Sequence, residues 1–421
     1  GTDASTMAVP PPAPALIALG DPLVDAVVRL GAAPLATVGI ADADAGGSHP
    51  VSREAAHALL EAAEAAGAAV VETPGGSAAN VARGVAALVR ASAAGPGGGE
   101  DAPTPSVAFV GKVGNDARGE AYAAALSAAG VRPLLARAPE TPTGVCTAVV
   151  DATGQRTMRP FLGAAAEMRA GDLASAAGGA MPPRSEGGQD RAGPLVLAIE
   201  GYQLWKEGLA EAACDAARRA GARVSLDLAS WELVRVRRAP LRRLLLSRAV
   251  DVLLMNEDEA HALLEDEGES RGGSGGMDAA TKRAVARDAL AFAVEDCGVL
   301  VASCSLGADG ALVRSRGCAE PQRVAAPRVD RVVDTTGAGD SYAAALLWAL
   351  FLAGGTGAVE LGTLGAGELA TMTATAARAG CAAGAAAVGC VGAQLPNERW
   401  EEVARCAFPN HVAAKGAERG S

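Results

Sequence analysis

The chain has 421 residues, half of which are hydrophobic, and its formal net charge is −11. This length suits one large α/β domain with loop insertions. The negative charge, with no basic cluster in the sequence, argues against a nucleic-acid-binding protein, because a surface that reads phosphates needs gathered Lys and Arg side chains. It does not exclude a small anionic substrate, for which a local site is enough.

Both ends and three internal segments have the composition of unstructured chain. Residues 1–14 are rich in Pro and Ala and are expected to be a disordered segment, such as the remnant of a transit segment, and residues 406–421 are an expected C-terminal tail. The three inserts, at 95–105, 178–194 and 265–278, are rich in Gly, Pro and charge. Because such segments bury few apolar groups, we expect exposed loops that the fold does not need.

The folded region is expected to span residues 15–405. A buried-strand pattern opens it at 15–19, and residues 68–89 read as a short strand, a Gly-rich turn and a helix. Further strands, each ending in a small or polar residue, are expected within 106–131, 194–201, 222–230, 249–264 and 297–313. Continuous apolar strands that alternate with helices indicate a three-layer α/β/α fold with a mostly parallel central sheet.

Two stretches interrupt this alternation. Residues 143–161 read as two strands around a turn at 151–154, which predicts a β-hairpin. Together with residues 25–39 the hairpin is expected to form a small second sheet, a β lid with strands near 25–40 and 143–162.

Eight cysteines and four histidines are scattered along the chain. No cysteines form a CxxC pair and no histidines have ligand-like spacing, so a zinc site is not expected. The cysteines lie mostly in apolar contexts, as reduced core residues of an intracellular protein do. The apolar runs near 343–353 and 381–393 are too short to cross a bilayer, so we expect a soluble protein without a membrane partner.

Polar side chains follow several of the predicted strands, and ligands of open α/β sheets bind at such strand ends. The clusters are Asp21 and Asp25, then Gly75, Gly76 and Asn80, then Asn256 and Glu259, and last the stretch 334–340. Each has an architectural explanation as a cap or turn. Four of them together favour a common site.

Residues 332–350, VVDTTGAGDSYAAALLWAL, change from strand-like to helical at their middle. Gly337 and Gly339 allow a tight turn and Asp340 suits a helix start, which is the architectural explanation. The same geometry makes an anion site, since a helix N-terminus offers free amides and a positive dipole end. Other phosphate motifs are missing: there is no GxxxxGK[ST], and GAGELA at 365–370 follows no strand.

These motifs resemble the ribokinase/PfkB carbohydrate kinase family, which includes the adenosine kinases. DTTGAGD (334–340) is similar to the family's most specific signature, GGSAAN (75–80) to its N-terminal one, and NEDE (256–259) to its NxxE motif. GDPLVD (20–25) resembles the start of the adenosine-kinase branch, and GQRTMRPFLGAA and SLDLASWELVR look closest to a plant and algal plastid branch. The resemblance implies a ribokinase-like fold and a location in the chloroplast or the cytoplasm.

The resemblance also implies an ATP-dependent kinase that phosphorylates a hydroxyl of a sugar or nucleoside. Asp340 would be the general base, and the amides of Gly337, Ala338 and Gly339 would form an anion hole. Asp25, Gly75, Gly76 and Asn80 would hold the acceptor. Asn256, Ser305, Gly307 and Gly310 would lie on the nucleotide side, and Asn256 and Glu259 would help to organise Mg²⁺ through water.

ATP and Mg²⁺ are the implied cofactors, and a monovalent cation such as K⁺ is left open. The expected state is a monomer or a homodimer through the lid. One alternative is a non-catalytic kinase-like subunit of a plastid assembly, against which the intact GAG and Asp340 count. Another is a dinucleotide oxidoreductase, disfavoured because no GxGxxG follows an N-terminal strand.

Arg156 and Arg159 lie on the predicted lid hairpin. They are expected either on a solvated face, which is favoured slightly, or as a clamp on an anionic group of the substrate.

Overall fold

The computed structural model describes residues 14–31, 33–41, 47–93, 105–152, 156–182, 196–265, 277–353 and 360–407. The expected N-terminal segment and C-terminal tail fall almost entirely outside these ranges. So do most residues of the three expected inserts.

Within the described ranges, the larger sheet has nine strands in the order β13-β12-β11-β10-β9-β8-β1-β4-β5. Neighbours from β5 to β11 pair in parallel, and only β12 and β13 are antiparallel. The bounds are β1 Leu16–Leu19, β4 Val107–Gly114, β5 Val131–Ala138, β8 Val196–Glu200, β9 Arg223–Asp227, β10 Val252–Asn256, β11 Val301–Ser305, β12 Ala311–Ser315 and β13 Gln322–Val324. The predicted mostly parallel sheet is confirmed.

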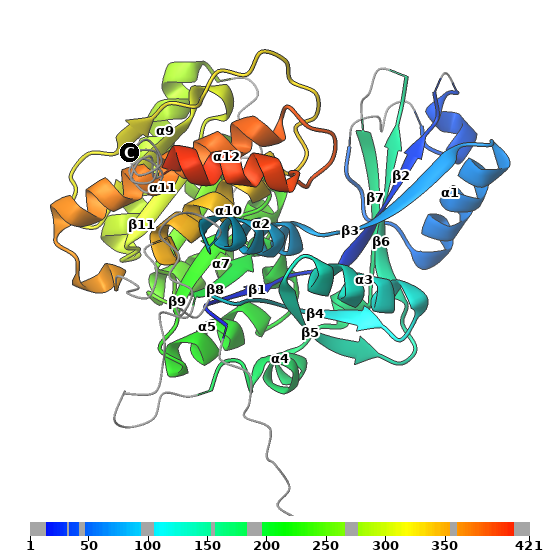
Figure 1. Cartoon of the computed structure of the whole chain (residues 1–421), viewed down its shortest axis with the longest axis horizontal. Coiled ribbons are helices and arrows are strands. Elements are labelled where there is room, and N and C mark those ends of the chain that lie inside the picture. The colour runs from blue at the N-terminus through cyan, green and yellow to red at the C-terminus, as the bar shows by residue number, and fades with distance from the viewer. Residues whose placement is uncertain are drawn as a thin grey trace, which may run out of the picture.

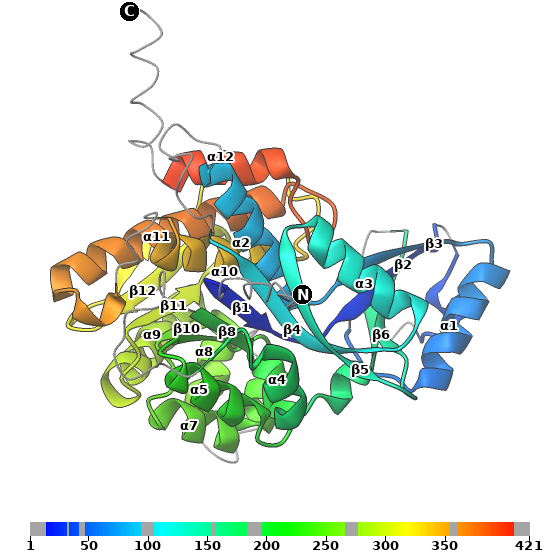
Figure 2. The same ribbon diagram turned by 60° about the horizontal axis from the view of Figure 1, so that its bottom comes forward.

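Helices cover both faces of this sheet (Figures 1 and 2). In the central strand β1, Leu16 and Ala18 pack into one apolar layer while Ile17 and Leu19 pack into the other. Side chains of a strand alternate between faces, so a strand buried on both sides must be apolar throughout. This explains the continuous apolar runs in the sequence and confirms the three-layer α/β/α fold.

One helical layer contains α2 Ser77–Ala93, α3 Ala117–Ala128, α10 Ala338–Phe351, α11 Ala366–Ala387 and α12 Asn397–Ala407. The other contains α4 Ala170–Ala177, α5 Leu209–Arg219, α6 Trp231–Val236, α7 Arg238–Leu246, α8 Glu257–Leu264 and α9 Ala279–Ala291. Within the described ranges, no helix combines the length and the apolar character needed to span a membrane.

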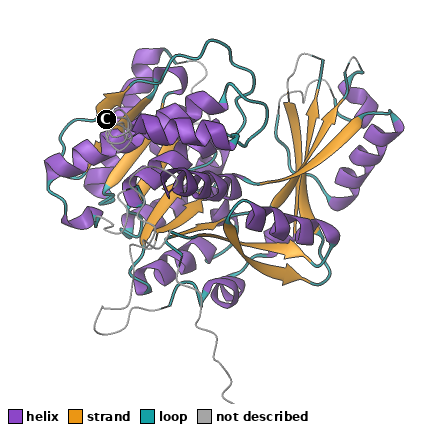
Figure 3. Cartoon of the chain, viewed as in Figure 1, coloured by secondary structure: helices purple, strands orange, loops and turns teal. Residues whose placement is uncertain are grey.

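A second sheet of four strands, in the order β3-β2-β6-β7, stands beside the larger one (Figure 3). Its strands are β2 Leu23–Arg29, β3 Ala69–Gly75, β6 Thr143–Val150 and β7 Arg156–Gly163, and α1 Arg53–Ala65 packs on it. The expected strand over 25–39 is wrong beyond Arg29. Gly31 takes a left-handed φ of 58°, which turns the chain, and residues 35–38 form a 3-10 helix instead.

The boundaries of two inserts need correction. Glu265, the first residue of the third insert, is buried and paired with Arg235 and Arg238 at 3.2 and 3.4 Å. Ala180 and Met181, at the start of the second, belong to the apolar core. Composition alone missed this because single buried residues adjoin the Gly-rich runs.

Replacing residues 266–276 with a short Gly/Ser linker is therefore expected to leave the free energy of unfolding nearly unchanged. Replacing 265–276 should lower it by about 1–3 kcal/mol, because two arginines lose their carboxylate partner. Urea unfolding of both variants measures the difference. Equal stabilities would show that the Glu265 ion pairs contribute nothing.

Candidate active site

The carboxyl ends of four adjacent strands place acidic and polar residues at one edge of the large sheet. Asp21 follows β1, and Glu200, Asp227 and Asn256 end β8, β9 and β10. Parallel strands end at the same edge, so these side chains share a region with the start of α10. The structure therefore brings the predicted strand-end clusters together.

Asp340 is partly buried in the first turn of α10 and is fixed by two side chains of α2. Ser77 Oγ donates to its Oδ1 at 2.7 Å, and Asn80 Nδ2 donates to its Oδ2 at 2.8 Å. Burial raises the pKa of Asp340, and the bonds from Ser77 and Asn80 oppose that rise. The carboxylate is thus held in one orientation with an enhanced affinity for a proton.

The two glycines before Asp340 differ in backbone conformation and in the space around them. Gly337 precedes α10 with a φ of 75°, and a Cβ there would lie 2.5 Å from the Ala393 carbonyl oxygen. Gly339 would meet nothing within 4 Å. The Ala338 amide already donates to the Thr335 carbonyl at 3.3 Å. The Gly339 amide lies in the first turn, where helix geometry supplies no intrahelical acceptor.

Asp25 and the turn at Gly75 and Gly76 fit closely. A Cβ on Gly75 would overlap the Asp25 carboxylate, and a Cβ on Gly76, whose φ is 91°, would overlap the Asp21 carbonyl oxygen. Burial raises the pKa of Asp25 to about 6, the charge of Asp340 adds to the rise, and nearby arginines oppose it. Only glycine lets Asp25 approach this turn.

Asn256 and Glu259 cap the start of α8 by bonding to each other. Glu259 accepts from the Asn256 amide and from Asn256 Nδ2, both at 2.8 Å, and Asn256 Oδ1 accepts from the Glu259 amide at 2.9 Å. Glu259 is buried, and its pKa is raised by burial and by the charge of Asp227. The pair is therefore an architectural cap that also adds a carboxyl group to the acidic edge.

The predicted nucleotide-side residues lie next to Asn256. Ser305 ends β11 and pairs in register with Asn256. Gly307 and Gly310 form the turn into β12 with φ values of 56° and 94°, and a Cβ on Gly310 would overlap the Val324 carbonyl oxygen. Both glycines are explained by backbone geometry alone, so their nucleotide role stays a prediction.

The sequence analysis missed three residues of this site. Glu200 is buried and Asp227 is partly buried, and burial raises the pKa of both, with the charge of Asp340 adding to each rise. Ser77 lies inside the GGSAAN stretch, where its sequence position alone does not distinguish it from a turn residue. Glu200 and Asp227 directly follow the apolar runs of β8 and β9, so the strand-end rule would have found them had it been applied to every strand.

The lid arginines are not solvated, so that expectation is wrong. Arg156, at the start of β7, forms an ion pair with Asp334 and donates to Thr336 Oγ1 at 2.9 Å. Arg159 is 7% exposed and donates to the Met158 carbonyl at 2.9 Å. The clamp on a substrate anion stays a prediction.

Asp334 connects the lid to the loop before α10. It accepts hydrogen bonds from the Thr336 amide at 3.0 Å and the Gly392 amide at 2.8 Å. Burial acts to raise its pKa, but these bonds and the charge of Arg156 outweigh burial and hold the pKa below its usual value. The ionised Asp334 therefore joins three separate segments beside Asp340.

A family model for carbohydrate kinases matches residues 51–400, and its description reads pfkB family carbohydrate kinase. The chain belongs to the pfkB family of carbohydrate kinases. This confirms the family predicted from DTTGAGD and GGSAAN, and it makes the chain a carbohydrate or nucleoside kinase. No curated protein gives a significant match.

Solved structures with a similar fold match most of the chain. The pfkB-family chain is similar to the adenosine kinase from Sinorhizobium meliloti at 27% identity and a TM-score of 0.65, covering 93% of this chain and 98% of that one. A probable sugar kinase from Rhizobium etli has 24% identity and a TM-score of 0.66, with 93% and 97% covered. The ribokinase from Giardia lamblia has 17% identity and a TM-score of 0.61, with 92% and 99% covered, and shows the shared fold.

Kinases of this family use ATP and typically Mg²⁺. Among the described residues, no three acidic, His or Cys side chains are arranged to hold a metal directly. The donor set nevertheless suits Mg²⁺, which prefers oxygen ligands and keeps several waters. Glu200 and Glu259 are buried and Asp227 is partly buried, and the pKa values of all three are raised. Lys206, which is also buried at this edge, pairs with Asp21.

These raised pKa values predict that stability falls as pH rises from about 4 to 8. In that range the folded acids still hold protons that the unfolded chain has released, so unfolding releases protons and rising pH favours it. Mg²⁺ should raise the melting temperature more at pH 8 than at pH 5. Melting curves at both values, with and without Mg²⁺, measure this.

Glu259→Gln is the matched variant, because it removes one buried carboxyl group and keeps the side-chain length. Its melting temperature should depend less on pH and on Mg²⁺ than that of the unchanged chain. If the melting temperatures of both proteins depended equally on pH and on Mg²⁺, Glu259 would not be one of the acids that the cation neutralises.

Proposed function

We propose that this chain transfers the γ-phosphate of ATP to a hydroxyl group of a sugar or nucleoside. The observation that carries the proposal is the setting of Asp340. Its carboxylate is oriented by Ser77 and Asn80 at the N-terminus of α10, directly after a glycine turn. A base next to an anion-binding helix end is what phosphoryl transfer to an alcohol requires.

In the proposed mechanism Asp340 accepts the proton of the attacking hydroxyl. A carboxylate with an ordinary pKa is a weak base at neutral pH, so the raised pKa of Asp340 favours proton transfer. Ser77 and Asn80 each donate to one oxygen and leave the remaining lone pairs for the substrate. The hydroxyl is thereby activated beside the phosphoryl group.

The start of α10 stabilises the negative charge of the transferring group. The N–H groups of its first turn lie at the positive end of the helix dipole, and the amide of Gly339 is the main proposed donor. Such preorganised donors act mainly on the transition state. The backbone amides of Gly337 and Ala338 are proposed to belong to the same anion hole, because these residues stand at the N-cap and the first position of α10.

Asp25, Asn80 and the turn at Gly75 and Gly76 are proposed to hold the hydroxyl groups of the acceptor. Carboxylate and amide groups bind adjacent hydroxyls well. The printed names of the similar structures, adenosine kinase, ribokinase and probable sugar kinase, support an acceptor of the sugar or nucleoside class.

Ser305, Gly307 and Gly310 are proposed to line the nucleotide side. Glu259, with Asp227 and Asn256 nearby, would hold Mg²⁺ through water. When bound, the metal neutralises phosphate charge. The chain's own part is to keep these acids together at the sheet edge.

The test is ATP consumption by the purified full chain with Mg²⁺, screened against nucleosides, sugars and sugar phosphates, with adenosine and ribose included. Acceptor-dependent ADP formation is the expected result. ADP formation that no acceptor stimulates, or none at all in a folded protein, would overturn the proposal and favour the non-catalytic subunit.

Arg156 is proposed to keep the lid against the catalytic loop. Arg156→Ala should raise the KM of the accepted substrate about tenfold, which corresponds to the lower end of the free energy that a charged hydrogen bond contributes. Faster hydrogen exchange is expected in β6 and β7. Arg29→Ala, which removes an exposed arginine from β2 of the same sheet, is the control. Equal KM and exchange in both variants would show that the Asp334 contact does not hold the lid.

A further inference from the structure

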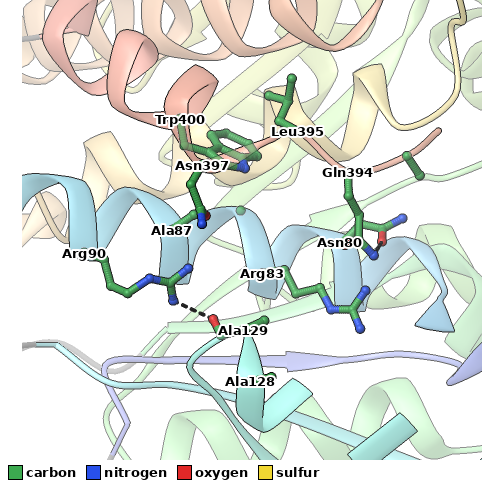
Figure 4. Close-up of a pocket in the computed structure, with 12 residues that line it drawn as sticks. Asn80, Arg83, Ala87, Arg90, Ala128, Ala129, Gln394, Leu395, Asn397 and Trp400 are labelled. Carbon is green, nitrogen blue, oxygen red and sulfur yellow. Dashed lines mark hydrogen bonds between the residues drawn. The ribbon is translucent and has the colours of Figure 1, made fainter. Parts of the chain in front are cut away.

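A pocket of about 220 Å³ lies along α2, between α2, the end of α3 and the segment that leads into α12 (Figure 4). Asn80, Arg83 and Arg90 line it from α2, and Gln394, Asn397 and Trp400 line it from the C-terminal side. Of these residues only Asn80 has a part in the proposed reaction, at the end of the pocket nearest Asp340.

The polar lining of the pocket is cationic. Arg83 and Arg90 are its charged residues, and no Asp or Glu lines it. They are seven residues apart, about two helical turns, so both project from the same side of α2, as Figure 4 shows. Two guanidinium groups without a lining carboxylate favour an anionic ligand over a cationic one, although the chain as a whole carries a net charge of −11.

Arg83 is a buried cation with too few partners. It is 8% exposed, and its Nη1 donates to the Pro74 carbonyl at 2.7 Å. Its Nε has no hydrogen-bond partner among the described residues. Burial lowers the pKa of Arg83, and Tyr122 and Asp25 offset only part of that effect. A buried donor without an acceptor costs free energy, so the described chain leaves this guanidinium incompletely satisfied.

Arg90 supplies a second, more accessible guanidinium. Its Nη1 donates to the Ala129 carbonyl at 2.5 Å, which fixes the side chain against the end of α3 and leaves its other donors toward the pocket and solvent. The Trp400 ring and the Asn397 amide face it across the pocket (Figure 4). This lining suits a charged head with a small polar body.

We propose that this pocket is a binding site for a small phosphorylated metabolite, whose phosphate accepts hydrogen bonds from Arg83 and Arg90. Planar guanidinium groups bind phosphate with paired donors. The volume admits a phosphate with a few carbon atoms, and the amides of Gln394 and Asn397 match hydroxyl groups on such a body.

The site touches the machinery around Asp340. Arg83 and Gln394 both donate to the Pro74 carbonyl, at 2.7 and 3.1 Å, and Pro74 precedes the Gly75–Gly76 turn. Asn80, at the end of the pocket, bonds to Asp340. A phosphate anion is therefore expected at two places, this pocket and the start of α10, and an experiment must separate them.

The experiment titrates inorganic phosphate into the full chain at constant ionic strength, in the presence of saturating ATP and Mg²⁺, and follows binding by calorimetry. The unchanged chain should show one saturable site. Arg90→Gln should lower the phosphate affinity about tenfold, because one charged hydrogen bond is lost. Arg405→Gln, which removes an exposed arginine of α12 outside the pocket, should leave it unchanged. Arg83→Gln should abolish binding.

Equal phosphate affinities in the unchanged chain, Arg90→Gln and Arg405→Gln would overturn the proposal. So would a phosphate signal that disappears when ATP saturates the chain, because the anion would then occupy only the α10 site. If Arg83→Gln fails to fold, the Arg90 and Arg405 variants decide the matter. The outcome does not depend on whether the chain turns over an acceptor.

Discussion

The Asp340→Asn variant is expected to fold like the unchanged chain and to lose turnover by about 10²–10⁴-fold, the contribution of a positioned base. Asn cannot take the proton of the attacking hydroxyl. It can keep the local bonds, because its carbonyl oxygen accepts from Asn80 Nδ2 while its amide donates to Ser77 Oγ, a hydroxyl that rotates to accept. The measurement is kcat with an accepted substrate, with melting curves alongside.

Asp340→Ala distinguishes the catalytic role of Asp340 from its structural role as a hydrogen-bond acceptor. It leaves both Ser77 and Asn80 without their acceptor, so it should also lower the free energy of unfolding by about 1–3 kcal/mol. The Asn variant should lose activity alone. Near-normal turnover in a folded Asn variant would remove the catalytic role and leave Asp340 as a helix-start residue.

Most of the fold followed from one physical rule. Strands buried on both faces must be apolar throughout, so the runs ending near Leu19, Glu200 and Asp227 were recognisable as a parallel sheet. The rule does not place β3, which the sequence analysis groups with the strands of the large sheet. In the structure β3 pairs with β2 in the small sheet. Most side chains of β3 are exposed, so its sequence carries no pattern that would assign it to either sheet.

The site was predictable where the residues lie close in sequence. Asn256 and Glu259, or Gly337 to Asp340, form local structures whose spacing carries the signal. The bonds that orient Asp340 could not be predicted this way, because Ser77 and Asn80 are 263 and 260 residues away from it. The Arg156–Asp334 pair is separated by 178 residues, and only the folded topology shows that the two meet.

Gly339→Ala is expected to keep the fold and to lower kcat by about 10²–10³-fold, as does the loss of one anion-hole donor. A Cβ on Gly339 would meet no other described segment of the chain within 4 Å, and the residue lies in the first turn of α10, where Ala is favoured over Gly. We propose that the transferring phosphoryl group occupies this open space. The new methyl group would occupy that space and push the phosphoryl oxygens away from the amides.

Gly337→Ala is the contrasting change. Gly337 has a φ of 75°, which costs a side-chain-bearing residue about 1–2 kcal/mol. Its Cβ would also press on the Ala393 backbone at 2.5–2.8 Å. This variant should therefore melt earlier, whereas Gly339→Ala should melt at or above the temperature of the unchanged chain. Normal turnover by a well-folded Gly339→Ala chain would mean that the phosphoryl group does not lie at the start of α10, because a methyl group there could not then be harmless.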